Sequence, residues 1–152
     1  MKKTGTKQSS KDVVITIRSS RSLEGETQKG PEFVTGGSYE FGSDAIRFSY
    51  LENVVSGVPG TKTVFLIKPS EVLLSRRGAV DANMVFRPGE CNDFLLRTAF
   101  GVLRMGVDTR RLDCALNENG GSMEIEYDLE FDKTFMGRNT FQIDVRESGT
   151  GQ

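Results

Sequence analysis

The stretch that decides the fold is MEIEYDLEF, residues 123–131, which follows the sequence NGG at residues 119–121. Five apolar residues alternate along it with four acidic ones: Met123, Ile125, Tyr127, Leu129 and Phe131 against Glu124, Glu126, Asp128 and Glu130. A period of two indicates a β-strand with one buried face. Asn and Gly tolerate the positive φ of tight turns, so the preceding NGG predicts a hairpin.

The same alternation recurs along the chain, between clusters of Gly, Pro, Asn and Asp, and no run has helical spacing. It predicts about ten strands from eleven segments, at residues 12–19, 32–41, 45–51, 61–68, 72–77, 82–86, 93–98, 101–107, 110–116, 123–131 and 138–146. The Gly36-Gly37 pair predicts a bulge or a sharp bend. Without a helix to cover a sheet edge, closure is favoured. We predict an all-β fold, a single antiparallel up-and-down barrel of about 8–10 strands. It spans residues 12–147, with disordered tails at 1–11 and 148–152.

Basic and acidic residues balance in number but not in position. The chain has 20 Lys and Arg against 21 Asp and Glu. Residues 62–111 hold nine bases, seven of them Arg, against five acids, whereas residues 112–152 hold nine acids against three bases. This asymmetry could mark a binding face, but in a barrel it more often means that neighbouring strands pair opposite charges. The even total argues against a strong electrostatic field, so we expect no membrane partner and no nucleic acid.

The chain contains no histidine. This absence excludes Ser-His-Asp and Cys-His nucleophile systems and histidine-ligated zinc or iron. There is also no C-x-x-C, no Walker loop and no G-x-G-x-x-G that opens a helix. We therefore expect no cofactor, no metal and no enzymatic activity; an enzyme would have to work with Arg, Tyr, Asp, Glu or Thr.

Cys91 and Cys114 are too few for a disulfide framework, and their apolar neighbours predict buried, reduced thiols. No apolar segment follows the basic N-terminus, and none reaches the ~20 residues of a membrane helix. These observations predict a cytoplasmic protein.

Two clusters of charge could form binding sites. The ladder Glu124, Glu126, Asp128 and Glu130 could hold calcium, but along a strand the four carboxylates do not converge. A solvated outer face, neutralised by bases across the strands, is favoured. The arginines could form an RNA face with Phe94 and Phe100 as stacking platforms, at Arg76, Arg77, Arg87, Arg97, Arg104, Arg110 and Arg111. The isoelectric point of about 5.6 and the apolar positions of most aromatic residues argue against it.

Several short motifs, weak alone, are specific in their order and spacing. They are Glu71-Val72-Leu73-Leu74, Arg76-x-Gly78-Ala79-Val80, Met84-x-Phe86, Phe100-Gly101, Thr109 and Tyr127-Asp128-Leu129. Through them the chain resembles the YwiB-like family of uncharacterised bacterial proteins over about residues 12–147. The resemblance implies a lipocalin-like, calycin-type β-barrel, and it carries over no catalytic residue because the family has no assigned activity. Leu96 departs from the family pattern, which has an aromatic residue there, and this implies a lost contact inside the barrel.

A barrel of about eight strands or slightly more is either filled by side chains or holds one small ligand. The large residues predicted to face inward leave both options open: Phe33, Tyr39, Phe41, Phe48, Tyr50, Phe86 and Phe141. We favour a non-enzymatic binder of a small amphipathic ligand, with its site at Arg76, Met84, Phe86, Thr109, Tyr127 and Tyr50. The alternative is an interaction module with a filled barrel that docks a protein or RNA partner on its surface.

Arg76 has two open orientations. It shares the parity of Val72 and Leu74, which places it in the lumen, where a guanidinium needs a partner. The predicted inward positions contain no carboxylate, so an anionic head group or trapped water would complete its hydrogen bonds. Alternatively, Arg76 points outward onto the acidic C-terminal strands.

Overall fold

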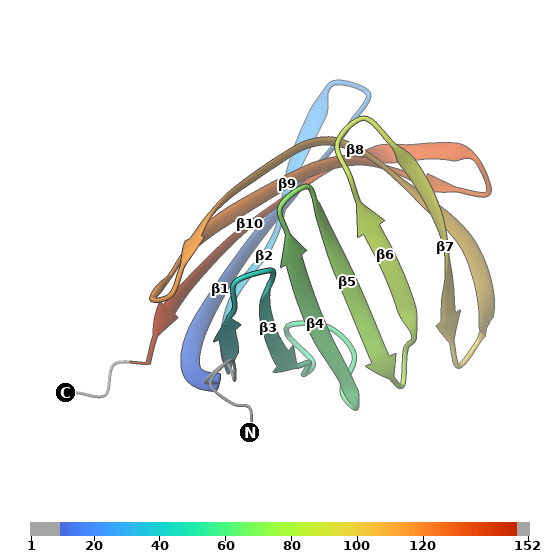
Figure 1. The fold of residues 1–152 in the computed structure, drawn as a ribbon. Helices are drawn as coiled ribbons and strands as arrows, with labels where there is room; N and C mark the ends of the chain where they lie inside the picture. The colour runs from blue at the N-terminus through green and yellow to red at the C-terminus, as the bar shows by residue number, and fades with distance from the viewer. Residues whose placement is uncertain (1–9, 149–152) are drawn as a thin grey trace.

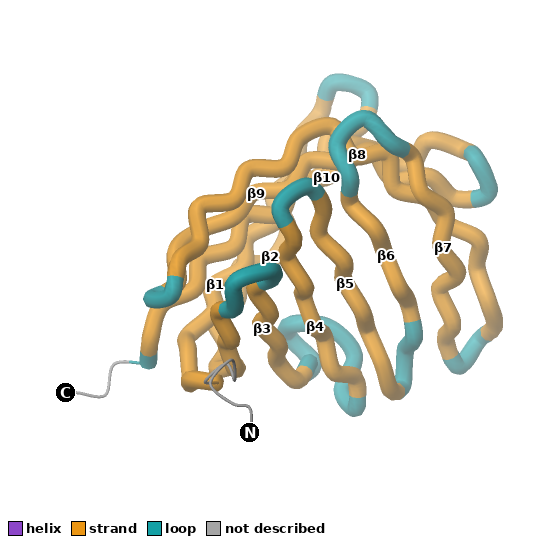
Figure 2. Tube along the Cα trace, in the orientation of Figure 1, coloured by secondary structure: helices purple, strands orange, loops and turns teal. Residues whose placement is uncertain are grey.

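Ten antiparallel strands form one sheet that curls into a nearly closed barrel (Figure 1). The computed structural model describes residues 10–148. The strands are β1 (Ser10–Leu23), β2 (Glu26–Phe41), β3 (Ile46–Leu51), β4 (Thr61–Lys68), β5 (Glu71–Gly78), β6 (Ala82–Phe86), β7 (Cys91–Thr98), β8 (Gly101–Asn117), β9 (Gly120–Phe131) and β10 (Thr134–Glu147). Strands and loops account for all of this part of the chain (Figure 2). The predicted all-β barrel is confirmed.

Except for β6 and β7, strands that are consecutive in the chain pair with each other in the sheet, and β1 also pairs with β10. The resulting order is β6-β5-β4-β3-β2-β1-β10-β9-β8-β7, which leaves one seam, between β6 and β7. Asp81 and Arg97 bridge that seam through two main-chain hydrogen bonds, with N···O distances of 3.0 and 2.9 Å. The Asn92 side-chain amide adds a bond of 3.4 Å to the Val85 carbonyl. The barrel is therefore closed at this seam by a few contacts rather than by a full ladder.

Because the strands run up and down, consecutive connections alternate between the two ends of the barrel (Figure 1). One end carries the β1–β2, β3–β4, β5–β6, β7–β8 and β9–β10 connections, and we call it the mouth. The opposite end, here the far end, carries the other four connections.

The core fills the middle of the barrel with side chains from nearly every strand. Val13, Ile15 and Ile17 of β1 are buried there, as the alternation predicts. The rings of Phe48 and Phe65 stack with centroids 4.7 Å apart. Phe41 and Phe131, which were also predicted to face inward, are each 40% exposed because they lie at strand ends.

Two local expectations are wrong for identifiable reasons, and a third is wrong in part. β1 and β2 continue as a long hairpin to Leu23 and Glu26, where the sequence predicts a polar loop; the exposed, polar extension carries no alternation. The segments 101–107 and 110–116 form one strand, β8, across a register shift between Thr109 and Arg111. At Gly36 and Gly37 the pairing with β1 stays in register, so the alternative of a bulge is wrong, whereas the alternative of a sharp bend stays a prediction. Gly37 is needed instead for close approach, since a Cβ there would collide with the Ser49 carbonyl oxygen and Ile15.

The predicted tails lie largely outside the described residues, which exclude 1–9 and 149–152. Ser10 and Lys11, assigned to the N-terminal tail by the sequence, already belong to β1. Cys91 and Cys114 are free but exposed, so the expectation of buried thiols is wrong. Among the described residues there is no helix with the length and hydrophobicity needed to cross a membrane.

Candidate functional site

A cavity of about 570 Å³ occupies the mouth half of the barrel. Its wall is mostly apolar and is built by side chains from opposite sides of the barrel, among them Ile17, Phe33, Met84, Phe94, Leu96, Met105, Leu129 and Phe141. This volume lies within the range of about 300–1,000 Å³ that is usual for small-molecule sites. The barrel is thus filled at its middle and hollow toward the mouth.

A buried ion pair forms one polar corner of this cavity. Glu52, the first residue after β3, turns its carboxylate inward, where its side chain is only 3% exposed. Arg76 of β5 donates from Nε to one carboxylate oxygen at 2.9 Å and from Nη2 to the other at 2.8 Å. This two-bond fork is the strongest geometry for an arginine–carboxylate pair.

Two further donors fix the Glu52 carboxylate. The Thr63 hydroxyl of β4 donates to Oε2, and the Val58 main-chain amide of the β3–β4 loop donates to Oε1 at 2.8 Å. Burial by itself raises the pKa of Glu52, but the hydrogen bonds from Arg76, Thr63 and Val58, with the charge of Arg76, outweigh it and lower that pKa. Glu52 is therefore ionised, and it ties the β3–β4 loop to the barrel wall.

Tyr50 lies beside this pair and keeps its proton. Burial first, and then the negative charge of Glu52, raise the pKa of the Tyr50 phenol to about 12. The Tyr50 ring packs edge-on against Phe33 with centroids 5.9 Å apart. The corner therefore combines a carboxylate, a guanidinium and neutral hydroxyls.

A second polar group lies elsewhere on the cavity wall, on β1, β9 and β10. Arg21 Nε donates to Asn139 Oδ1 at 3.2 Å. Burial raises the pKa of the neighbouring Tyr127 phenol to about 12, against the lowering effect of a hydrogen bond with Asn139. The cavity thus offers hydrogen-bonding groups at two places within an apolar wall.

The structure brings four of the six expected site residues to the cavity: Arg76, Met84, Tyr127 and Tyr50. Phe86 and Thr109 lie outside its wall, in the core. Phe86 is fully buried with its ring 5.0 Å from that of Tyr127. Thr109 is 1% exposed, and its hydroxyl has no hydrogen-bond partner among the described residues.

Arg76 faces the lumen, so the alternative of an outward arginine on the C-terminal strands is wrong. The expectation that no inward carboxylate exists is also wrong, because Glu52 supplies one. Glu52 is not among the predicted site residues because it lies beyond the last residue of β3, where alternation is a weaker guide to the buried face. The sequence carries one signal for it: Glu52 lies two residues after Tyr50, so a strand that places Tyr50 inward also directs Glu52 inward.

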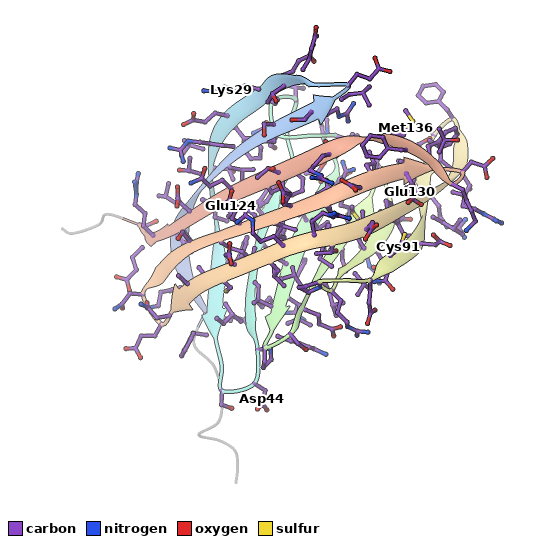
Figure 3. All side chains as sticks on the ribbon, turned by 90° about the horizontal axis from the view of Figure 1, so that it is seen from above. Lys29, Asp44, Cys91, Glu124, Glu130 and Met136 are labelled. Atoms are coloured by element: carbon purple, nitrogen blue, oxygen red, sulfur yellow. The ribbon has the colours of Figure 1, made fainter. Side chains whose placement is uncertain are left out.

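The acidic ladder of β9 lies on the outer face of the barrel, where Figure 3 labels Glu124 and Glu130. Arg111 of β8 donates to Glu124 at 3.2 Å, and Arg138 of β10 donates to Asp128 at 2.7 Å. The predicted pairing of opposite charges between neighbouring strands is confirmed at these positions. No group of three metal-ligating side chains occurs within residues 10–148.

Fold and cavity together define a single up-and-down β-barrel with a hollow, mostly apolar end. A model of the family described as "Domain of unknown function (DUF1934)" matches residues 15–143, and the chain belongs to this family. The curated "Uncharacterized beta-barrel protein YwiB" of Bacillus subtilis (strain 168) is 30% identical over 116 residues, which are 76% of this chain and 80% of YwiB.

The solved structure titled "Crystal structure of ywiB protein from Bacillus subtilis" has the same fold. It superposes with a TM-score of 0.80 at 23% sequence identity, over 93% of this chain and 95% of that chain. The resemblance to YwiB-like proteins inferred from the motifs is therefore confirmed, and with it the barrel. The narrower assignment to the calycin, or lipocalin-like, type stays a prediction.

Proposed function

We propose that this protein is a non-enzymatic binder that holds a small amphipathic ligand in the mouth cavity. The observation that carries the proposal is the cavity of about 570 Å³, with an apolar wall and a buried polar corner. Apolar sites with a few fixed polar groups are the usual form of small-molecule sites.

The polar corner supports a head group of particular chemistry. Arg76 commits Nε and Nη2 to Glu52, which neutralises its charge and leaves Nη1 outside those two bonds. A lone inward arginine would demand an anion, whereas this paired arginine requires none. A head group with an acceptor oxygen, such as a hydroxyl, a carbonyl or a carboxylate, fits it, and the chain of the ligand lies along Met84, Leu96 and Met105.

A cavity-filling substitution tests the proposal with a matched control. Leu96→Trp adds bulk inside the mouth cavity, at a position whose side chain lines it. Leu112→Trp adds the same bulk beside the separate depression of about 600 Å³ at the far end. The probe is a dansyl-labelled fatty acid, whose fluorescence rises when it enters an apolar site.

We expect the wild type and Leu112→Trp to bind the probe with equal affinity, and Leu96→Trp to bind at least about tenfold more weakly because the indole occupies part of the cavity that the probe would fill. Loss of probe binding in Leu112→Trp alone, or equal binding in all three proteins, contradicts a ligand site in the mouth cavity. Circular dichroism of both variants establishes that they are folded.

A further inference from the structure

Exposed apolar side chains gather around the mouth of the barrel. Fourteen large apolar residues are exposed in the described chain, and all but Val34, Phe41 and Leu95 lie on the strand ends and turns of the mouth. Phe100, at the tip of the β7–β8 hairpin, is 100% exposed, and Val54 in the β3–β4 loop is 82% exposed. Scattered exposed apolar residues are ordinary, but a gathering at one end marks an interaction surface.

This apolar rim is continuous with the cavity wall. Leu96 and Met105, which line the cavity, pair across their strands with exposed Leu103 and Phe131 respectively. Val55 in the β3–β4 loop both lines the cavity and is 61% exposed. One apolar surface therefore runs from the inside of the barrel out over its edge.

Basic side chains flank one sector of the rim. Lys62 of β4, Arg77 of β5, Arg97 of β7 and Arg104 of β8 are exposed and form no ion pair with any described residue. The strands β3 to β8 are consecutive around the barrel, so these four bases flank the β3–β4, β5–β6 and β7–β8 connections.

Acidic groups at the mouth lie mainly in the other sector. Glu24 and Glu26 flank the tip of the β1–β2 hairpin, and Asp132 lies in the β9–β10 turn. Asp81, the carboxylate in the β5–β6 connection, accepts a hydrogen bond from the Gly78 main chain. In Figure 3, Lys29 and Met136 at the mouth lie on the side of the molecule away from Asp44 at the far end.

We infer that the basic sector of the rim docks on the surface of an anionic lipid bilayer, with Phe100 and the β3–β4 loop entering the interface. Exposed apolar side chains beside unpaired bases complement anionic lipid in both hydrophobicity and charge. A second copy of this chain fits poorly, since a symmetric contact would bring Lys62, Arg77, Arg97 and Arg104 against the same four bases. The inference goes beyond the proposed ligand site and stands without it.

The even charge total of the chain led to the expectation of no membrane partner. Around the mouth the charges are unevenly distributed, because most carboxylates there lie on β1–β2 and β9–β10 and leave the four bases of the other sector unpaired among the described residues. Docking of this kind is peripheral and leaves the barrel outside the hydrocarbon core.

Cosedimentation of the full chain with extruded vesicles tests the inference. One vesicle preparation is phosphatidylcholine alone, and the other is an equal mixture of phosphatidylcholine and phosphatidylglycerol. The rim variants are Phe100→Ser, which removes the fully exposed ring, and Arg97→Gln/Arg104→Gln, which removes two bases. The matched control is Arg47→Gln/Arg146→Gln, which removes two exposed bases near the far end.

We expect the wild type to bind the anionic vesicles, more weakly at high salt, and not the neutral ones. Arg97→Gln/Arg104→Gln lowers the partition coefficient about thirtyfold, from the usual contribution of two bases near an anionic surface. Phe100→Ser lowers it about tenfold or more, and the far-end control leaves it within about twofold.

Three results overturn the inference: no binding of the wild type to anionic vesicles, an equal loss in the far-end control, or unchanged binding in both rim variants. Light scattering of the same samples measures whether the rim instead joins two copies of the chain. If the wild type forms a dimer that Phe100→Ser dissociates, and if it does not bind vesicles, then the rim is a contact between two copies of the chain. This result contradicts docking on a lipid surface. None of these results bears on probe binding by Leu96→Trp.

Discussion

Two arginine–carboxylate forks of similar geometry lie on opposite faces of the barrel wall. Inside, Arg76 reaches Glu52 at 2.9 and 2.8 Å; outside, Arg138 reaches Asp128 at 2.7 and 3.4 Å. The inner side chains are 26% and 3% exposed, the outer ones 43% and 13%. The inner pair is shielded from water and holds a loop against the cavity, whereas the outer pair is part of a screened surface ladder. Location, rather than bond length, decides what each pair contributes.

The largest effect is expected from Arg76→Met. This change leaves the Glu52 carboxylate buried without its counter-charge, so the free energy of unfolding falls by about 2–3 kcal/mol, somewhat below the cost for a fully buried pair. Urea denaturation measures it. If Arg76 were buried without a partner, Arg76→Met would instead leave the free energy of unfolding unchanged or raise it.

The double variant Arg76→Met/Glu52→Gln is the control for this prediction. Gln carries no charge, and its amide oxygen can accept from the Val58 main-chain amide while its NH2 donates to the Thr63 hydroxyl, so the double variant recovers most of the lost stability. Equal stability of the wild type and Arg76→Met would show that the inner pair contributes no more than a surface pair.

An intermediate effect is expected from acid. The pKa of Glu52 is lower in the folded protein than its ordinary value of 4.5. Its contribution to stability is therefore complete above that value and disappears as the pH falls through the lower folded pKa. Other carboxylates titrate in the same range, so the useful quantity is the difference in unfolding free energy between the wild type and Glu52→Gln.

We expect this difference to be about 1–2 kcal/mol at neutral pH and to shrink toward zero as the pH falls below 4.5 and through the lower folded pKa of Glu52. Urea denaturation at a series of pH values measures it. A difference that stays constant over the whole series contradicts an ionised Glu52 in the folded state.

The smallest effect is expected from Arg138→Met on the outer face. Exposed pairs contribute about 1 kcal/mol or less, and salt screens them further. Arg110, whose Nη1 lies 3.9 Å from Asp128 Oδ2, remains to compensate. Urea denaturation at low and high salt measures the change; a loss as large as that of Arg76→Met removes the distinction between the two faces.

Much of the barrel was predictable because burial on one face leaves a period of two in the sequence. The segments 61–68 and 82–86 coincide with β4 and β6. The alternation in MEIEYDLEF correctly identifies the buried face of β9, except at Phe131, which lies at the exposed end of the strand. The extension of the β1–β2 hairpin was not predictable in this way. Its residues are exposed or half-buried without an alternating buried face, and they are held by main-chain pairing, so side-chain polarity shows no pattern there.

The candidate site was predictable only in part, for a different reason. Tyr50, Arg76, Met84 and Tyr127 follow from strand parity, since each lies within a regular strand. Glu52 is separated from Arg76 by 24 residues, and the pair exists only because β3, β4 and β5 are neighbours in the sheet. The position of the cavity depends on where large side chains meet across the barrel, which no local pattern records.

Native mass spectrometry of freshly purified protein tests whether the mouth cavity holds a small amphipathic ligand. We expect a mass above the 16.8 kDa of the chain, by the mass of one small molecule that organic solvent extracts. We expect Leu96→Trp, purified in the same way, to show the mass of the variant chain alone. A wild-type spectrum with only the chain mass under gentle conditions, or an adduct equally abundant in Leu96→Trp, contradicts a ligand in the mouth cavity.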